Sequence, residues 1–204
     1  MASTSARGPG RPRASSRATI HEAALELFLE RGYDAVSLDD IARRAGVSRG
    51  TLFAYVDAKA DALWGSLDAA IERASDAFQS TTDDPQAGKA VTRLIDAAVR
   101  AVEPWGTAPP TVLRDAAAMG AAAPLRDGAA ARLQPLADRA ALAIALECDE
   151  LPESPEAAVA PVAILAAACA ALVAWAATPA RPPAAEALRA ALAPLAALAE
   201  TAQA

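Results

Sequence analysis

The sequence predicts an all-α fold with a small N-terminal head and a larger helical body, and three observations support this. More than half of the 204 residues are apolar but only 4% are aromatic, so alanine, leucine and valine must supply most of the packing surface. Alanine has the highest helix propensity and loses no rotamer entropy on folding. Apolar residues recur at helical spacing between Gly, Pro and polar breaks, and no stretch shows the alternation of a half-buried strand.

The N-terminal elements follow from local signals. Residues 1–15 are rich in Arg, Pro, Gly and Ser without an apolar period, and we expect a disordered basic arm. A first helix is predicted from about Ser16 to Arg31, where apolar residues form one stripe and a glycine follows as C-cap. Ser37, with an acidic residue three positions later, predicts the start of a short second helix. Ser48 predicts the start of a third helix of about two turns.

The remaining chain predicts long helices separated by Pro, Gly or acidic breaks. A fourth helix is expected to open at Lys59 and to end near the polar run 80–85. Three prolines, Pro135, Pro161 and Pro194, should each kink a helix, start one, or show that two helices have been merged into one. Further helices are predicted near residues 86–103, 109–122, 125–148, 155–177 and 183–202.

Charge is distributed unevenly along the chain. The net charge is −6, but residues 1–59 carry nine Lys or Arg and seven Asp or Glu, whereas residues 60–204 carry ten and eighteen. Residues 1–20 hold four arginines and no acidic residue. Because the field that a phosphate experiences is local, the acidic overall charge does not exclude binding of this end to DNA.

Several classes of function lack their usual residues. The two cysteines, Cys148 and Cys169, are too few and too far apart to predict a disulfide framework or a zinc site. The single histidine, His21, has no metal-ligand cluster or catalytic motif around it in sequence, and no phosphate-binding glycine loop is present. We therefore expect no metal, no cofactor and no enzymatic activity. The N-terminus lacks a secretory apolar segment, which predicts a cytoplasmic protein.

A charge-free run from Ala157 to Ala180 leaves two interpretations open. Its length is that of a membrane span. However, it consists mainly of alanine and contains Pro161, and an apolar helix buried between two subunits has the same composition. We favour the second interpretation and expect no membrane association.

The most informative segment, from Ser37 to Lys59, reads S-L-D-D-I-A-R-R-A-G-V-S-R-G-T-L-F-A-Y-V-D-A-K. Two short predicted helices flank an Ala-Gly-Val-Ser turn, which is typical of a helix-turn-helix. Gly46 permits a positive φ at the turn, Val47 fills the space between the helices, and Ser48 accepts bonds from free amides of the next helix. With Leu52 and its apolar neighbours turned inward, the other face of this helix is left for the major groove.

The stretch from Arg17 to Leu67 resembles the DNA-binding domain of the TetR family, whose signature is similar to A-G-V-S-x-G-T-L-[YF]-x-[YH]-F-x-x-K. The resemblance covers about a quarter of the chain. The chain departs from it at Val56, where the family commonly has phenylalanine, and this loses burial worth about 1 kcal/mol. The resemblance implies a helix-turn-helix DNA-binding domain at 16–62 and a body at 63–204 that binds a small-molecule effector and forms a homodimer.

The resemblance also implies individual contacts with double-stranded DNA. Arg49, Thr51 and Phe53 would contact bases at a palindromic operator. Ser37, Ser48, Tyr55 and Lys59 would contact phosphates, with Lys59 as the usual anchor. For Arg43 and Arg44, DNA contact and a solvated surface position both remain open. The full set of expected DNA-binding residues is Ser37, Ser48, Arg49, Gly50, Thr51, Phe53, Tyr55 and Lys59.

A longer stretch, L-F-A-Y-V-D-A-K-A-D-A-L-W-G-S-L-D-A, is also similar to regulators associated with mycofactocin gene clusters, whose effector is a long-chain acyl-CoA. Its Trp64 is alternatively a core aromatic at the junction of head and body. The resemblance as a whole implies a ligand-responsive transcriptional repressor. The alternatives from other classes are a helical membrane-associated interaction protein and an enzyme without a recognisable catalytic motif.

Bulky apolar residues in the body predict where an effector would bind, although each is alternatively ordinary core. They are Phe78, Trp105, Val112, Leu113, Met119 and Leu133. Arg114 and Arg139 either hold an anionic ligand group or form surface ion pairs. The residues expected to form a four-helix interface between two subunits are Val162, Leu165, Cys169, Leu172, Leu188, Leu192, Leu195 and Leu198.

Overall fold

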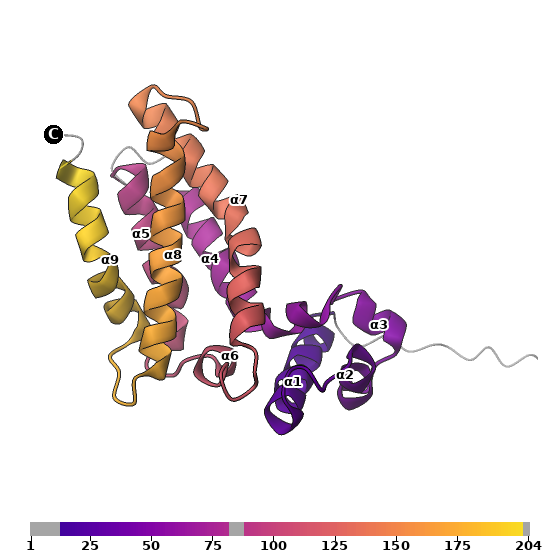
Figure 1. Ribbon diagram of the computed structural model, residues 1–204. Coiled ribbons are helices and arrows are strands. Elements are labelled where there is room, and N and C mark those ends of the chain that lie inside the picture. The colour runs from indigo at the N-terminus through magenta and orange to yellow at the C-terminus, as the bar shows by residue number, and fades with distance from the viewer. Residues whose placement is uncertain (1–12, 82–87, 202–204) are drawn as a thin grey trace, which may run out of the picture.

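The computed structural model describes residues 13–81 and 88–201, and every regular element in these two ranges is a helix (Figure 1). The predicted all-α fold is confirmed. In chain order the elements are α1 (Arg13–Arg31), α2 (Leu38–Ala45), α3 (Arg49–Phe53), the 3₁₀ helix η1 (Lys59–Leu63), α4 (Gly65–Ser80), α5 (Ala90–Val102), the 3₁₀ helix η2 (Glu103–Trp105), α6 (Thr111–Arg114), α7 (Ala122–Cys148), α8 (Pro155–Ala177) and α9 (Ala184–Thr201).

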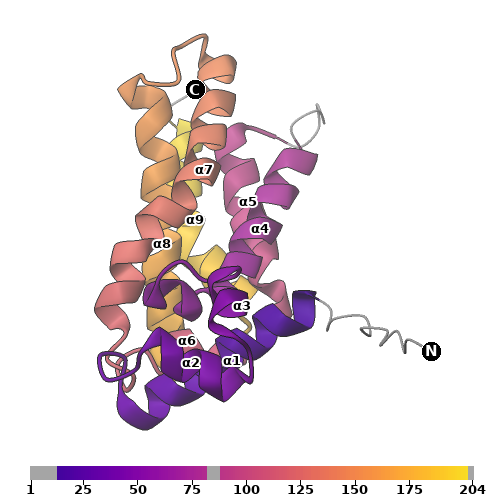
Figure 2. The same ribbon diagram turned by 90° about the vertical axis from the view of Figure 1, so that its right-hand side faces the viewer.

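The helices form a head and a body. The body is a ring of helices in which α4 packs on α5, α5 on α9, α9 on α8, α8 on α7 and α7 on α4, and α5 also contacts α7 and α8 across the ring. The head, built from α1, α2 and α3, lies at one end of this ring, with α3 farthest from the body in Figure 1 and all three helices in front of it in Figure 2. The head is joined to the body through η1, α4 and the N-terminal part of α7.

Local capping defines the helices of the head, as the sequence predicts. Ser37 and Asp40 form a reciprocal capping box at the start of α2. Gly46 ends α2 in the left-handed region with φ 66°, a conformation that glycine adopts without steric cost. The Ser48 hydroxyl then accepts a bond from the Thr51 amide at the start of α3. These bonds satisfy free amides at both helix starts and determine the angle of the turn.

The fourth helix begins later than the sequence predicts. Lys59 lies in η1, and the α-helix α4 starts only at Gly65. The interruption lets Trp64 turn into the core of the head, where it is 5% exposed. It also brings Gly65 against His21, since a Cβ at residue 65 would lie 2.6 Å from the imidazole ring. The approach needed for this packing is available only to glycine.

A second correction concerns the predicted helix at 109–122, of which only α6 (Thr111–Arg114) is an α-helix. The chain then continues in turns to Gly120, which has a positive φ of 68°. The Tyr33 amide, in the loop between α1 and α2, donates to the carbonyl of Met119 over 2.7 Å. This bond ties the segment to the head and takes the carbonyl out of any helical ladder.

Other boundaries agree with prediction to within a few residues. Helix α8 spans the predicted 155–177, and α9 lies within one residue of the predicted ends. Helix α1 begins at Arg13, three residues before the expected start, so the part of the expected disordered arm at 1–12 lies outside the described residues. Pro135, Pro161 and Pro194 all lie inside continuous helices, so none of them marks two merged helices.

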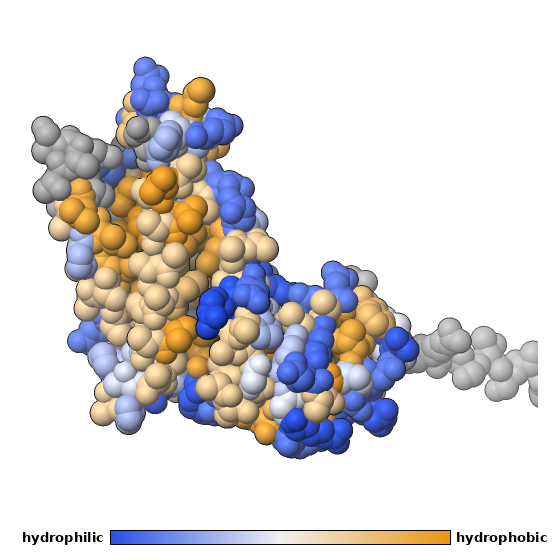
Figure 3. Space-filling model, in the orientation of Figure 1, coloured by the Kyte–Doolittle hydropathy of each residue, from blue (hydrophilic) through white to orange (hydrophobic). Residues whose placement is uncertain are grey.

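Helix α8 carries a wide apolar face that its own subunit leaves uncovered. Val159, Val162 and Val173 are 62%, 54% and 56% exposed, and Leu198 of α9 is 64% exposed. Figure 3 shows apolar side chains over α8 and α9 on this side of the body. The stretch 157–177 is long and apolar enough to cross a membrane by composition alone; its most apolar 18-residue window has a mean hydropathy of 2.4, and 28% of that window is buried.

The residues expected at a subunit interface therefore divide into two groups. Leu165, Leu188 and Leu192 are at most 5% exposed and belong to the core of their own body. Val162 and Leu198 are exposed, while the others lie between these extremes: Cys169, Leu172 and Leu195. Of the residues predicted at the subunit interface, Val162 and Leu198 are therefore the ones exposed at the surface of the body.

Candidate nucleic-acid interface and ligand cavity

Helix α3 presents one polar face to solvent and one apolar face to the head. Leu52 and Val56 are 0% and 1% exposed in the core of the head, as predicted from the sequence. On the other face Arg49 and Gly50 are exposed, and Phe53 is 41% exposed. An exposed aromatic ring beside an arginine suits contact with base edges and thymine methyl groups.

Arg49 is held only weakly in the free protein. Its guanidinium lies 3.4 Å from the carboxylate of Asp39 and 5.5 Å from the centre of the Phe53 ring. The arginine and aspartate side chains are 68% and 53% exposed, so the ion pair contributes little to stability. Arg49 is thus positioned outside the head yet available to exchange this partner for a base.

The hydroxyl groups of the two capping serines are already engaged within their own helix starts. The Ser37 hydroxyl lies 2.5 Å from a carboxylate oxygen of Asp40, and this carboxylate also accepts bonds from the Ser37 amide and the Arg43 guanidinium. These bonds lower the pKa of Asp40 to about 2. The Ser48 hydroxyl lies 2.8 Å from that of Thr51. The predicted phosphate contacts of both serines would therefore share oxygens that already cap helices.

Arg43 and Arg44 occupy surface ion pairs. Arg43 binds Asp40 over 2.9 Å, and Arg44 reaches Glu30 over 2.6 Å and Glu26 over 3.1 Å. The bonds from Arg44 lower the pKa of Glu30. Both arginines therefore lie at the surface, and their contact with DNA stays an open prediction.

Lys59 has a different position from the one expected. Its ammonium donates to the backbone carbonyl of Tyr33 over 2.8 Å and lies 4.2 Å from the centre of the Tyr33 ring. It therefore fastens η1 to the loop between α1 and α2 instead of opening α4. Tyr55, at the C-terminal side of α3, is half-buried. Contacts of Lys59 and Tyr55 with phosphate remain predictions.

The residues predicted to line a ligand pocket are not brought together. Phe78 and Leu133 pack in the core of the body, whereas Val112 and Met119 are fully buried in the core of the head. Trp105 and Leu113 contact both cores, and the Trp105 ring stacks on that of Trp175 at 6.4 Å. The sequence shows no signal that divides these similar apolar residues between two cores.

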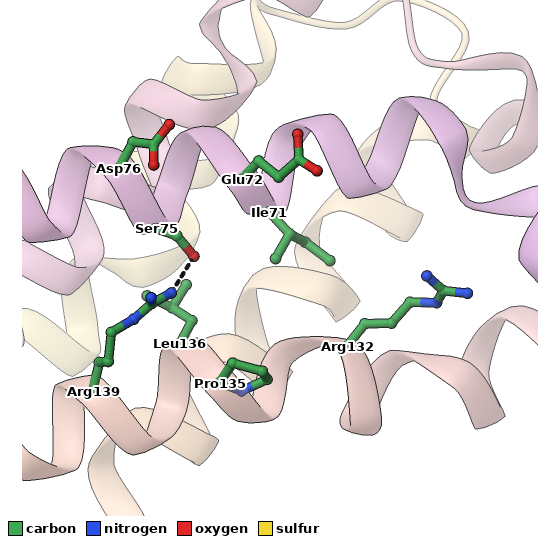
Figure 4. Close-up of a pocket in the computed structure, with 8 residues that line it drawn as sticks. All are labelled: Ile71, Glu72, Ser75, Asp76, Arg132, Pro135, Leu136 and Arg139. Atoms are coloured by element: carbon green, nitrogen blue, oxygen red, sulfur yellow. Dashed lines mark hydrogen bonds between the residues drawn. The ribbon is translucent and has the colours of Figure 1, made fainter. Parts of the chain in front are cut away.

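A cavity of about 440 Å³, broadly open to solvent, lies between α4 and α7, and Figure 4 shows the residues that line it. None of the predicted pocket residues lines it. Arg139, which the sequence analysis considered for an anionic ligand, does line it and donates to the Ser75 hydroxyl over 2.7 Å. Arg114, the other candidate, instead forms an ion pair with Asp115. The lining residues are Ile71, Glu72, Ser75, Asp76, Arg132, Pro135, Leu136 and Arg139.

Sequence reasoning missed Arg132 altogether. This side chain of α7 binds Asp61 of η1 and Asp68 of α4, which lie 71 and 64 residues earlier in the chain. No local spacing rule connects partners so far apart. In the part of the chain that the structure describes, no three His, Cys, Asp or Glu side chains are grouped as a metal site.

Comparison with known sequences identifies the head. Residues 20–61 match the family of bacterial regulatory proteins described as tetR. MftR of Mycobacterium tuberculosis, named as a mycofactocin biosynthesis transcriptional regulator, is 46% identical over 58 residues, which are 28% of this chain and 29% of that protein. The transcriptional activator FasR of Mycolicibacterium smegmatis is 36% identical over 84 residues, 39% of this chain and 38% of that protein. Each match covers less than two fifths of the relative's length.

Comparison with solved structures extends to the body. FadR of Thermus thermophilus, a TetR-family transcriptional repressor solved in complex with lauroyl-CoA, is 26% identical with a TM-score of 0.53, covering 88% of this chain and 93% of that one. NalD of Pseudomonas aeruginosa, a secondary repressor of the MexAB-OprM multidrug efflux pump, shares the fold at 21% identity and a TM-score of 0.58, covering 91% and 97%. The described chain therefore has the fold of TetR-family regulators, and its residues 20–61 match the N-terminal model of that family.

Proposed function

We propose that this protein is a cytoplasmic, non-enzymatic repressor that binds a palindromic operator as a homodimer and releases it when a small amphipathic effector binds the body. The observation that supports DNA binding most directly is α3, a capped helix with Arg49 and Phe53 on its exposed face. The expected base contacts are made by Arg49, Thr51 and Phe53. Phosphate contacts are proposed for Ser37 and Ser48, at the starts of α2 and α3, and for Tyr55 and Lys59.

The uncovered face of α8 and α9 supports the homodimer. Exposed valines on a helix of this length are costly in water unless a partner covers them. A second copy would cover the same face by two-fold symmetry, and this arrangement would set the two heads in successive major grooves about 34 to 36 Å apart. A membrane surface is the alternative partner of this face. Recovery of a dimer without detergent would exclude the membrane alternative.

Two comparisons support an acyl-CoA as the effector. FadR, at 26% identity, was solved with lauroyl-CoA. The similarity to MftR over 58 residues agrees with the similarity seen in the sequence to mycofactocin-associated regulators. FasR is named as an activator, so the direction of regulation needs its own measurement. A promoter-reporter assay with and without the protein distinguishes repression from activation.

Release of DNA would follow from movement of α4. This helix begins beside the head at Gly65 and lines the cavity with Ile71 and Ser75. An effector can change the separation of the two heads only to the extent that it binds one separation more tightly than the other. Spin labels at Ala54→Cys, at the end of α3 and in a Cys148→Ser, Cys169→Ser background, measure that separation. An effector that dissociates DNA without changing the distance would contradict this mechanism.

The test of DNA binding is selection of genomic fragments by the purified protein, followed by affinity measurements on the selected site. Arg49→Ala should weaken binding by about 1 to 3 kcal/mol and relax preference at one base position, because a bidentate contact to a base edge is lost. The matched control is Arg189→Ala, which removes an exposed arginine of α9 and should leave affinity unchanged. An unchanged footprint and affinity for Arg49→Ala would count against the assignment of α3.

A further inference from the structure

One arginine of the body holds three segments at the junction with the head. Nη2 of Arg132 lies 2.5 Å from Asp61 of η1, and its Nη1 lies 2.8 Å from Asp68 of α4. The guanidinium also lies 4.8 Å from the centre of the Trp64 ring. Arg17 of α1 approaches Asp68 over 3.6 Å from the other side. The side chains of Arg132 and Asp68 are only 24% and 17% exposed, so water screens this pair less than the ion pairs on the head surface.

The packing beside this ion cluster places α7 closely against the head. A Cβ added at Gly128, one helical turn before Arg132, would lie 3.1 Å from Nε1 of Trp64. Trp64 is itself buried in the core of the head. The position of α7 relative to η1 therefore depends on the close contact of Gly128 with the Trp64 ring and on the bonds of Arg132.

The same arginine also lines the cavity between α4 and α7. Figure 4 shows Ile71 and Ser75 projecting from α4 toward α7, Arg139 reaching back to Ser75, and Glu72 and Asp76 pointing away from α7. Arg139 forms no ion pair with any residue in the two described ranges. The lining thus combines apolar surface with Arg139 at one end and Arg132 at the other, where the Arg132 guanidinium points away from Arg139 in Figure 4, and it also includes two carboxylates.

We propose that this cavity binds a ligand with a carboxylate or phosphate group on an apolar chain, and that the anionic group competes with Asp61 and Asp68 for Arg132. The apolar chain would lie against Ile71, Pro135 and Leu136. Binding releases η1 and α4 from α7 and so loosens the head on the body. This inference rests on the proposed function only for its effect on DNA, because ligand binding itself involves no DNA.

Competition gives the proposal a signature that a purely structural ion cluster lacks. Removing Asp61 as a competitor should make Arg132 more available, and the ligand should bind more tightly. Removing Arg132 should have the opposite effect. Arg139→Gln should weaken binding of the ligand without disturbing the bonds of Arg132 to Asp61 and Asp68, since Arg139 contacts neither carboxylate.

The experiment uses Trp64 as the reporter. The chain contains three tryptophans, so Trp105→Phe with Trp175→Phe leaves Trp64 as the only indole and keeps an aromatic ring at each altered site. The full-length protein is titrated with octanoate, octyl phosphate and octan-1-ol while Trp64 emission is recorded. Both anions should produce a saturable change, and octan-1-ol should bind about tenfold more weakly because it lacks the charge-assisted bonds.

Variants in this background test the competition. Arg132→Gln should lower the affinity for octanoate about tenfold or more. Arg126→Gln, at an exposed position on the same helix, should leave this affinity unchanged. Asp61→Asn should raise the affinity for octanoate about two- to fivefold. The side-chain oxygen of the asparagine can still cap η1. Far-ultraviolet circular dichroism confirms that each variant is folded. If Arg132→Gln is unfolded, Asp61→Asn and Arg139→Gln decide the outcome.

The outcomes separate this inference from the proposed function. An unchanged octanoate affinity in Arg132→Gln, equal binding of octan-1-ol, or weaker binding in Asp61→Asn overturns the inference, whatever the protein does with DNA. Failure of the protein to select any DNA overturns the proposed function and leaves the Trp64 titrations intact. With a selected operator, octanoate should lower DNA affinity in the wild-type protein and should have little effect in Arg132→Gln.

Discussion

The head and the body fill their cores with different side chains. Alanine makes up 6 of the 19 buried residues in the core of the head but 12 of the 25 in the core of the body. The head fills its centre with large residues such as Phe28, Ile41 and Leu52, each 0% exposed. The body instead lets helices approach closely through small residues. The head should therefore be sensitive to loss of volume and the body to its addition.

The largest expected effect is in the head. Leu52→Ala should reduce the free energy of unfolding by about 2 to 5 kcal/mol, because it leaves a cavity under α3 that a five-residue helix cannot fill. Urea unfolding followed by circular dichroism measures the loss. Leu146→Ala, at a position 77% exposed, is the control and should change stability little. A loss in Leu52→Ala no greater than in the control would remove the basis of the comparison.

The body should respond to enlargement. Ala140 of α7 is 0% exposed within the ring, and Ala140→Leu should cost about 1 to 3 kcal/mol because the helices must move apart to admit the side chain. Ala130→Leu, at an exposed position of the same helix, should be close to neutral. Thermal unfolding of the two variants tests this contrast. Equal midpoints would mean that the ring has space that its alanines do not fill.

Helix caps should distinguish the two regions by a smaller amount. Ser48 caps the five-residue α3, and Ser154 caps the 23-residue α8 in the same way. Each change to alanine should cost about 1 kcal/mol. Amide hydrogen exchange should show loss of protection across all of α3 but only in the first turn of α8. The five-residue α3 has no further turns whose hydrogen bonds would keep it folded once its cap is lost. Ser48→Asp, which keeps an N-cap acceptor, should restore protection in α3.

The smallest expected effect is a pH dependence at the junction. Burial lowers the pKa of His21 below 6.5, and its Nδ1 lies 3.0 Å from the Ala62 carbonyl. Because the unfolded chain binds this proton more readily, stability should be constant above pH 6.5 and should fall as the pH drops toward the folded pKa. His21 is the single histidine, so in His21→Gln the midpoint of thermal unfolding should no longer depend on pH between pH 5.5 and about 7. A slope that survives in the variant would exclude His21 as its source.

The same contrast explains what the sequence predicts well. In the head, Ser37, Gly46 and Ser48 each specify a helix end through contacts within four residues, and all three are confirmed. In the body, helix content and the span of α8 follow from composition and breaks. The early end of α6 does not, because it depends on a bond between Met119 and Tyr33, which are far apart in sequence.

The candidate sites divide in the same way. The exposed face of α3 follows from the helical period of one short segment. The cavity does not, since Arg132 and Arg139 project from α7 toward α4 partners that lie more than 60 residues earlier in the chain. Lys59 illustrates the remaining difficulty. Its place in the signature is clear, but its side chain bonds to a carbonyl that only the folded head brings within reach.

Helix α7 has a mechanical consequence of its own. The residues from Gly128 at the Trp64 contact to Arg139 in the cavity lie on one unbroken helix, over a length of about 16 Å. A helix of this kind resists bending, so a tilt imposed at the Arg139 end displaces the indole contact directly. Pro135 lies between the two points and removes one backbone bond from the rod. The stiffness of α7 at Pro135 therefore determines how far a displacement of α7 at the cavity also moves its contact with the head.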